Sequence, residues 1–408
     1  MEQEPVLLLL AGIVAGYVAF FVCPVFLNPD RTMKFLPYIV KIDPIGLDLA
    51  QMLDYSRAWF VRGQSPYVGA NLYPPGAVVL FVPFLCVNAV TAYHLMTLIN
   101  LICYGGCVFL LPWLVFKDRE RLPVLLAVFF SGLFSYGFHF ELERGQFNLL
   151  ACAGYVWAIY LFHHHKRLRF LSYGLFCLAV QLKIYPAIFI ILFISDWRDW
   201  RTNLRRITGL FAVNVGLLFV LGPRIFQDFL RALARESSSN LWIGNHSIRA
   251  FVLLAPLPAE WFFRLLLYAL VAACIGGIIV VSYRQRLTGF HAPLFLGCTV
   301  AALLLPSVSN DYTLTLLTVA MSLAFPHRQL MLSKAKKTIS RGLLLSIAVA
   351  YASTLYSFTN KPRILRNNMP ALLIILCAWT IWVVFLQNAA FRSAVSDEEE
   401  WSKAVDGT

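Results

Sequence analysis

Long apolar runs without any charged residue recur from one end of this chain to the other. Several exceed eighteen residues, which is the length that an α-helix needs to cross a bilayer. Charged residues make up only 13% of the 408 positions, about half the share usual in soluble domains. The sequence therefore predicts an all-α polytopic membrane protein of ten to thirteen membrane helices, some of them short or re-entrant.

The formal net charge of +13 does not indicate nucleic-acid binding, because no basic stripe lies on a soluble domain. Lys and Arg instead form short clusters between the apolar runs, a pattern typical of cytoplasmic membrane loops. These clusters lie at 117–121, 163–169, 198–206, 284–286 and 328–341. With the N-terminus inside, the first long polar loop faces outward. We expect a multi-pass protein of a bacterial plasma membrane whose active site faces outward.

One integral-membrane domain is predicted over residues 1–395, followed by an acidic, disordered tail at 396–408. The first span, 6–27, leads into a polar and aromatic outer loop at 28–75. Within this loop, residues 48–60 have an amphipathic pattern, which predicts a helix lying along the membrane surface. Gly63 and Pro66 mark where that helix ends.

For two apolar segments the sequence does not predict a single, continuous membrane-spanning helix. Residues 170–194 have basic clusters at both ends and contain Lys183 and Pro186, which predicts two half-helices with their break at 181–186. Residues 76–116 are long enough for one span at 93–116 and a shorter half-helix at 78–88. An ionisable side chain inside an apolar segment, such as Lys183, is a functional candidate by default.

Cysteine and histidine do not predict a metal site or a cofactor. The nine cysteines all fall inside apolar segments, where they behave as small buried hydrophobes. Three consecutive histidines, 163–165, point in different directions on a helix and lie in a basic cluster. They are interpreted as interfacial charge.

Polar patches converge on the predicted outer side at 141–148, 224–249, 307–312 and 359–368. Asp48 is the strongest catalytic candidate, because apolar neighbours can tune a carboxylate at the membrane boundary for proton transfer. With Gln51 three positions later, it also fits a helix cap. The substrate-binding candidates are Tyr67, Tyr73, Arg144, Gln146, Asn148, Lys183, Asn245, His246, Ser247, Asn310, Asp311 and Tyr312.

Structural alternatives stand beside each of these assignments. The tyrosines fit an interfacial aromatic belt as well as a sugar-stacking role. Arg144 fits a snorkelling side chain, and Lys183 a partner of a nearby acid. Asn245, Ser247 and Asp311 also suit the caps of the helices that follow them.

In order and spacing, these features resemble glycosyltransferase family 87, a group of membrane enzymes of the GT-C superfold that includes polyprenyl-phosphomannose-dependent mannosyltransferases. The resemblance rests on Asp48, on Gly63-x-Ser65-Pro66-Tyr67 and on Tyr73-Pro74-Pro75. Weaker matches are Gly145-Gln146-x-Asn148, Leu182-Lys183-x-x-Pro186 and Asn245-x-Ser247. Some relatives carry a histidine motif where this chain has Ser309 to Tyr312, which puts the identity of donor and acceptor in question.

The resemblance implies a transferase that moves a sugar, with mannose as first candidate, from a polyprenyl-phosphate donor to a lipid or glycan acceptor with inversion. Asp48 would be the base, and Lys183 and Arg144 would lie near the donor phosphate. The protein would act as a monomer without a cofactor. A transporter or lipid flippase is the alternative, but it predicts internal repeats that we do not find. A structural membrane protein would not need Lys183.

Overall fold

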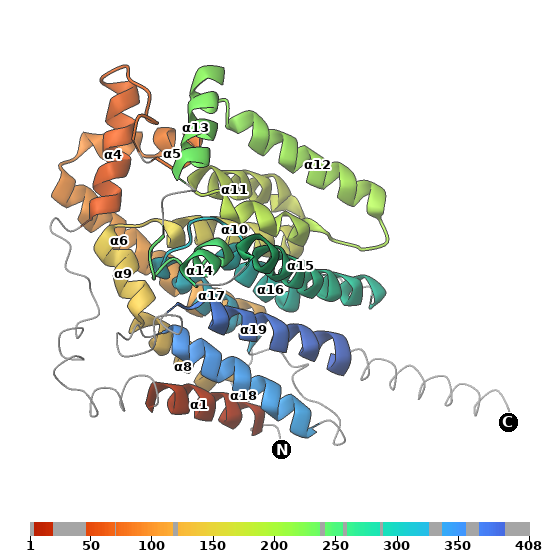
Figure 1. Ribbon diagram of the computed structural model, residues 1–408. Coiled ribbons are helices and arrows are strands. Elements are labelled where there is room, and N and C mark those ends of the chain that lie inside the picture. The colour runs from red at the N-terminus through yellow and green to blue at the C-terminus, as the bar shows by residue number, and fades with distance from the viewer. Residues whose placement is uncertain are drawn as a thin grey trace, which may run out of the picture.

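The computed structural model describes residues 4–18, 46–69, 71–116, 121–236, 241–255, 259–285, 289–325, 337–355 and 367–387. Within these ranges the chain is helical and has no strand apart from an isolated bridge between Asn245 and Asn310 (Figure 1). An all-α protein is therefore confirmed. The tail at 396–408 and residues 28–45 of the outer loop lie outside the described residues.

The elements follow one another as α1 (Glu4–Tyr17), α4 (Leu47–Phe60), α5 (Pro75–Leu80), η2 (Val82–Cys86), α6 (Ala89–Gly105), η3 (Gly106–Leu110), α7 (Leu111–Phe116), α8 (Leu122–Leu133), α9 (Tyr136–Arg144), α10 (Asn148–His164), η5 (Lys166–Leu168), α11 (Arg169–Leu182), η6 (Tyr185–Phe193), α12 (Trp200–Leu217), α13 (Pro223–Glu236), α14 (Ile248–Leu254), α15 (Glu260–Arg284), α16 (Ala292–Leu304), η7 (Asp311–Leu314), α17 (Thr315–Ala324), α18 (Lys337–Thr354), α19 (Met369–Ile381) and η11 (Trp382–Gln387).

The helices stack in an order that does not follow the sequence. In Figure 1, α1 lies against α18 at one edge, α19 and α16 come next, and α10, α11 and α12 form the other side. Every residue of α16 and of α17 is buried, so these two helices form the centre of the bundle. Helices that are apolar on all sides belong at such a centre.

The described ranges contain both long and short apolar helices. In the described ranges, two helices are long and apolar enough to cross a membrane, namely 89–116 and 260–284, and a bent pair can count as a third. Five shorter apolar helices accompany them. The bent pair is α8 and α9, which meet at 49°.

The predicted break in the segment 170–194 is confirmed. α11 ends at Leu182, Lys183 is extended (φ −146°, ψ 143°), and the chain continues as a 3-10 helix from Tyr185. Pro186 fits this change, because proline lacks an N–H donor and so cannot continue the hydrogen-bond ladder of α11, whereas it is tolerated in the first turn of the helix that follows. The half-helix predicted at 78–88 is also present, as α5 and η2.

Two expectations about the outer loop are wrong. Asp48 does not cap its helix, since Gly46 occupies that position in a left-handed conformation (φ 78°) and Asp48 lies inside the first turn. The helix also does not turn its apolar face to a membrane surface. Leu49, Met52 and Leu53 are buried by protein, in a cluster with side chains of α5, α6 and α10.

Candidate active site

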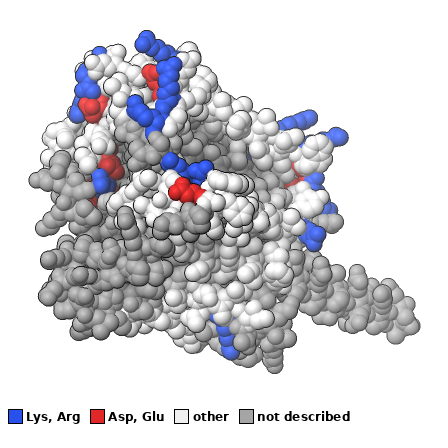
Figure 2. All heavy atoms as spheres, viewed as in Figure 1, with Lys and Arg blue, Asp and Glu red and all other residues white. Residues whose placement is uncertain are grey.

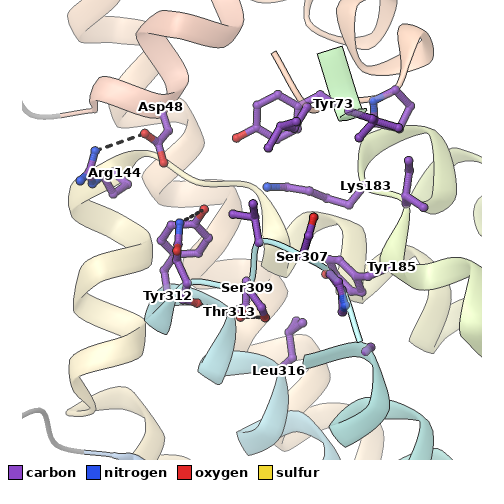
Figure 3. A pocket seen from close by; sticks show the side chains of 18 of the residues that line it. Asp48, Tyr73, Arg144, Lys183, Tyr185, Ser307, Ser309, Tyr312, Thr313 and Leu316 are labelled. Atoms are coloured by element: carbon purple, nitrogen blue, oxygen red, sulfur yellow. Dashed lines mark hydrogen bonds and ion pairs between the residues drawn. The ribbon is translucent and has the colours of Figure 1, made fainter. Parts of the chain in front are cut away.

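A cavity of about 810 Å³ opens at the end of the bundle where α4 and α9 meet (Figure 3). Its walls come from α4, the segment 72–74, the end of α9, the break at 183–185, and the segment 306–316. Segments far apart in the sequence therefore build one site. The polar interval around Asp48 and the broken helix at Lys183 lie on the same cavity.

Two glycines bring the first turn of α4 against the end of α9. Gly145 ends α9 with φ 61°, and a side chain there would place its Cβ 2.9 Å from the Cβ of Leu49. The backbone N–H of Gly46 donates to the carbonyl of Glu143 at 2.7 Å. Because the two backbones approach so closely, side chains from the two helices meet at the cavity wall.

Both carboxylate oxygens of Asp48 have a partner. Arg144 Nη1 donates to Oδ1 at 3.3 Å, and Gln146 Nε2 donates to Oδ2. The side chains of Asp48 and Arg144 are only 15% and 21% exposed, so water screens this ion pair less than it would at the surface. Figure 3 shows the pair at one edge of the cavity.

Lys183 places its ammonium in the middle of the site. Its Nζ donates to Gln146 Oε1 at 2.9 Å and lies 4.4 Å and 4.5 Å from the ring centroids of Tyr73 and Phe147. Ring faces attract cations at such distances. In Figure 3, Lys183 extends between Tyr73 and Tyr312. An amide oxygen and two aromatic faces thus hold the cation.

Tyr73 supplies a hydroxyl next to the same amide. Gln146 Nε2 lies 3.3 Å from its hydroxyl oxygen. Burial, followed by the proximity of Tyr312 and Asp48, raises the pKa of Tyr73 well above its ordinary value. The hydroxyl therefore keeps its proton at neutral pH. Tyr73 can pack against a substrate or accept a hydrogen bond, but it does not supply an anionic base.

The opposite wall carries hydroxyl and amide groups from Ser307, Ser309, Asn310, Tyr312 and Thr313. In Figure 3, Ser307, Ser309, Tyr312 and Thr313 lie on the same space as Asp48 and Lys183. Groups of this kind can both donate and accept hydrogen bonds, which suits a polyhydroxylated ligand.

A buried histidine stands behind that wall. His246 Nε2 lies 3.0 Å from Ser309 Oγ and 3.3 Å from Thr313 Oγ1, while Nδ1 lies 3.4 Å from Asp311 Oδ1. Asn368 donates to the same Asp311 oxygen at 2.9 Å. The histidine and the aspartate are buried and do not line the cavity. They orient hydroxyls that do.

Asn245 and Ser247 also support the wall from behind. The Asn245 amide and the Ser247 hydroxyl both donate to the carbonyl of Ser307 at 3.1 Å. Ser247 accepts from the N–H of Ala250 as well, which confirms its expected cap on α14. Tyr67 has a comparable supporting position, with its hydroxyl donating to the carbonyl of Tyr73 at 2.8 Å.

Sequence reasoning missed the part played by Glu141, which is fully buried. Its carboxylate accepts from the backbone N–H groups of Asn148 and Leu149 at 2.7 Å and 3.2 Å, and from the Asn148 side chain at 2.7 Å. The first N–H groups of a helix have no partner within the helix, and Glu141 satisfies them for α10. Asn148 is therefore engaged in the helix start and does not line the cavity.

The structure brings six of the thirteen sequence-predicted residues to the cavity wall: Asp48, Tyr73, Arg144, Lys183, Asn310 and Tyr312. The other seven lie behind it. Gln51 and Tyr55 are wall residues that the sequence analysis did not select as site residues. Their spacing from Asp48, three and seven positions along one helix, is the signal that identifies them. Over the described part of the chain, no group of three or more His, Cys, Asp or Glu side chains could hold a metal ion.

Comparison with known families gives one match. A family model described as glycosyltransferase family 87 matches residues 71–307, more than half of the chain. The matched region contains Tyr73, Arg144 and the broken helix at Lys183. It begins after α4 and ends at Ser307, so Asp48 and most of the opposite wall lie outside it. No curated protein and no solved structure matches the chain.

Proposed function

Because this chain belongs to glycosyltransferase family 87 and is thus a membrane glycosyltransferase, we propose that it transfers a sugar from a polyprenyl-phosphate donor to a hydroxyl of a lipid or glycan acceptor. Mannose is the first candidate for the sugar. Transfer proceeds by inversion with Asp48 as the base. The protein acts as a monomer on the outer face of a bacterial plasma membrane.

The observation that carries this proposal is one cavity in which a carboxylate, Asp48, and a cation without an ion-pair partner in the described part of the chain, Lys183, face the same space. Lys183 contacts an amide rather than a carboxylate among the described residues. It can therefore take up a new anionic partner without breaking an ion pair. A base for the acceptor and a cation for the leaving phosphate are the two groups that this reaction needs.

The reaction is a single displacement at the anomeric carbon. The acceptor oxygen forms the new bond to this carbon as its proton passes to Asp48, and the bond from the carbon to the phosphate oxygen breaks. The electron pair of that bond leaves with the polyprenyl phosphate, whose charge changes from −1 to −2. Lys183 stabilises the additional charge, so the leaving group needs no proton donor.

Two further features support this assignment. The wall formed by Ser307, Ser309 and Thr313 offers hydroxyls to a sugar, and tyrosines line the opposite side. The cavity also lies at the end of the bundle away from the basic start of α12. Figure 2 shows Lys and Arg at the right-hand edge, over that end of α12 (Figure 1), and also at the top, over α4 and α13, where Asp and Glu lie among them. The basic cluster at 198–206 belongs to the end that is expected in the cytoplasm.

The test replaces Asp48 by asparagine and measures sugar transfer from polyprenyl-phosphate-sugar donors by the purified protein. We expect kcat to fall by roughly 10²- to 10⁴-fold, the range that general-base catalysis contributes. Asp54→Asn is the matched control, because Asp54 lies on the same helix, is exposed and pairs with Arg62. Wild-type turnover by a folded Asp48→Asn variant would overturn the assignment.

A further inference from the structure

The side chain of Gln146 lies between Lys183 and Asp48 and is hydrogen-bonded to both. Its side-chain oxygen accepts from Lys183 Nζ at 2.9 Å, and its side-chain nitrogen donates to Asp48 Oδ2 and approaches the Tyr73 hydroxyl at 3.3 Å. Gln146 is fully buried and does not line the cavity. It therefore touches both chemical groups of the site from behind.

The chemistry of the neighbours allows only one orientation of this amide. An ammonium group can only donate hydrogen bonds, so the amide oxygen must face Lys183. The amide NH₂ then faces Asp48, whose carboxylate can only accept. The charge at Lys183 thus determines which end of Gln146 faces the carboxylate.

The backbone of Gln146 is fixed as well. Its N–H donates to the carbonyl of Glu141 at 3.0 Å, and its carbonyl accepts from the Asn100 side chain at 2.6 Å. Gln146 follows Gly145, whose left-handed conformation ends α9. With the backbone held on both sides, the side chain has little freedom to leave its two partners.

We propose that Gln146 is a positioning residue that couples Lys183 to Asp48, holding the carboxylate in place by a hydrogen bond whose direction Lys183 sets. This role rests on Asp48 acting as the base. It differs from the substrate contact expected from the sequence, because Gln146 acts through other side chains. Lys183 therefore contributes to the base as well as to the leaving phosphate.

Two substitutions separate this role from a purely structural one. Gln146→Leu removes the side-chain hydrogen bonds to Lys183, Asp48 and Tyr73. Gln146→Glu keeps the acceptor for Lys183 but places a second carboxylate against Asp48. Close carboxylates repel when both are ionised, whereas a protonated carboxylic acid can donate as the amide does. The other charged or titratable groups around Asp48 are Arg144 from α9, Tyr73 from the segment before α5, Tyr312 from η7, and Glu141 beyond Lys183.

The experiment measures kcat and the donor KM at several pH values for wild type, Gln146→Leu and Gln146→Glu. For Gln146→Leu we expect kcat to fall roughly tenfold to hundredfold, as for the loss of a hydrogen bond to a charged group, with less change in KM. For Gln146→Glu we expect the ratio of its kcat to that of wild type to rise as the pH falls. Gln227→Glu adds the same charge at an exposed position of α13. The ratio of its kcat to that of wild type should stay constant as the pH changes.

Thermal unfolding of each variant shows whether it is folded. A Gln146→Leu variant with wild-type kcat, or a Gln146→Glu ratio that does not change with pH, would overturn the coupling. Asp48→Asn in the same assay distinguishes a failure of the coupling through Gln146 from a failure of the proposed function. If Asp48→Asn is inactive while both Gln146 variants are fully active, only the coupling fails. Full activity of Asp48→Asn overturns the proposed function, and the coupling with it.

Discussion

Lys183 illustrates how this site keeps a cation available. A lysine beside a carboxylate would have its charge neutralised, whereas here an amide oxygen and two aromatic faces surround it. Such contacts stabilise an ammonium group more weakly than a close carboxylate does. Because an ammonium group has three N–H donors, an incoming phosphate can accept from Lys183 while the amide of Gln146 keeps its own hydrogen bond.

Replacing Lys183 by methionine keeps the length of the side chain and removes its charge. We expect kcat/KM for the donor to fall by roughly 10²- to 10³-fold, the effect of removing one group that stabilises charge in a transition state. Lys183→Arg should retain more activity because it keeps the charge. The measurement is the rate of sugar transfer as a function of donor concentration.

Lys166→Met is the matched control, because Lys166 is exposed in the basic cluster at the other end of the bundle. Its activity should equal that of wild type. If Lys183→Met kept wild-type kcat/KM, or if the control lost as much activity, Lys183 would not be the leaving-group cation.

The sequence predicts Asp48 and Lys183 as candidates from their local surroundings. Asp48 is an acid with apolar neighbours in a polar loop, and Lys183 is a base inside an apolar segment. The position of Gln146 between them is not predictable in this way. It depends on a contact between α4, the start of α10 and the break after α11, which are separated by many residues. His246 likewise looks like a ligand-binding residue in the sequence, yet its partners bury it behind the wall.

At the scale of elements, the contact between α4 and the end of α9 sets the distance between the base and Arg144. Gly145 contributes no side chain to this contact and lies against the Cβ of Leu49 and the backbone of Gly46. A larger residue at position 145 must either move α4 or strain the turn.

Two glycines with nearly the same backbone conformation test this contact. Gly145 (φ 61°) has Leu49 Cβ 2.9 Å from where its own Cβ would lie, whereas Gly63 (φ 63°) has nothing within 4 Å. Each substitution by alanine costs about 1–2 kcal/mol for the left-handed conformation alone. We expect Gly145→Ala to lower both the unfolding temperature and kcat, and Gly63→Ala to lower only the unfolding temperature.

Thermal unfolding and sugar transfer measured on the same preparations provide the comparison. The difference between the two variants isolates the approach of α4 to α9, since the backbone strain is shared. Equal activities in both variants would show that the site does not depend on this approach.

Breaks within apolar segments are predictable here when proline causes them, and Pro186 identifies the break after Lys183. The cap of α4 is less predictable. Asp48 and Gln51 fit a capping pattern, but a left-handed Gly46 begins the helix, because Gly46 must pass close to the ring of Tyr93 and the backbone of Glu143. A tertiary contact therefore shifts the start of the helix and releases Asp48 for the cavity.

For the whole molecule, the important property is that its two ends differ, with the cavity at one end and a basic helix start at the other. The cavity lies where α4 and α13 project from the bundle, and the basic start of α12 lies at the opposite end (Figures 1 and 2). Because the proposed donor carries its sugar at one face of a membrane, only one orientation of the bundle lets the cavity reach it. Orientation is thus part of the proposed function.

Accessibility of engineered cysteines to a membrane-impermeant thiol reagent tests the orientation. In a Cys86→Ala background, which removes the one cysteine that is exposed among the described residues, we place cysteine at Gln64 beyond α4 or at Thr202 in α12. Both positions are exposed and lie outside the cavity wall. We expect Gln64→Cys to react in intact cells and Thr202→Cys to react only after permeabilisation.

The unmodified Cys86→Ala background gives the baseline of labelling, and transfer activity of both variants shows that they are folded. The reverse pattern would place the cavity on the cytoplasmic side and exclude an outward-facing donor, while leaving the roles of Asp48 and Lys183 intact. Labelling of both positions from one side would mean that Gln64 and the start of α12 lie on the same side of the membrane. The basic clusters would then not predict the orientation of this chain. Orientation and catalytic assignment can therefore be tested, and can fail, independently of each other.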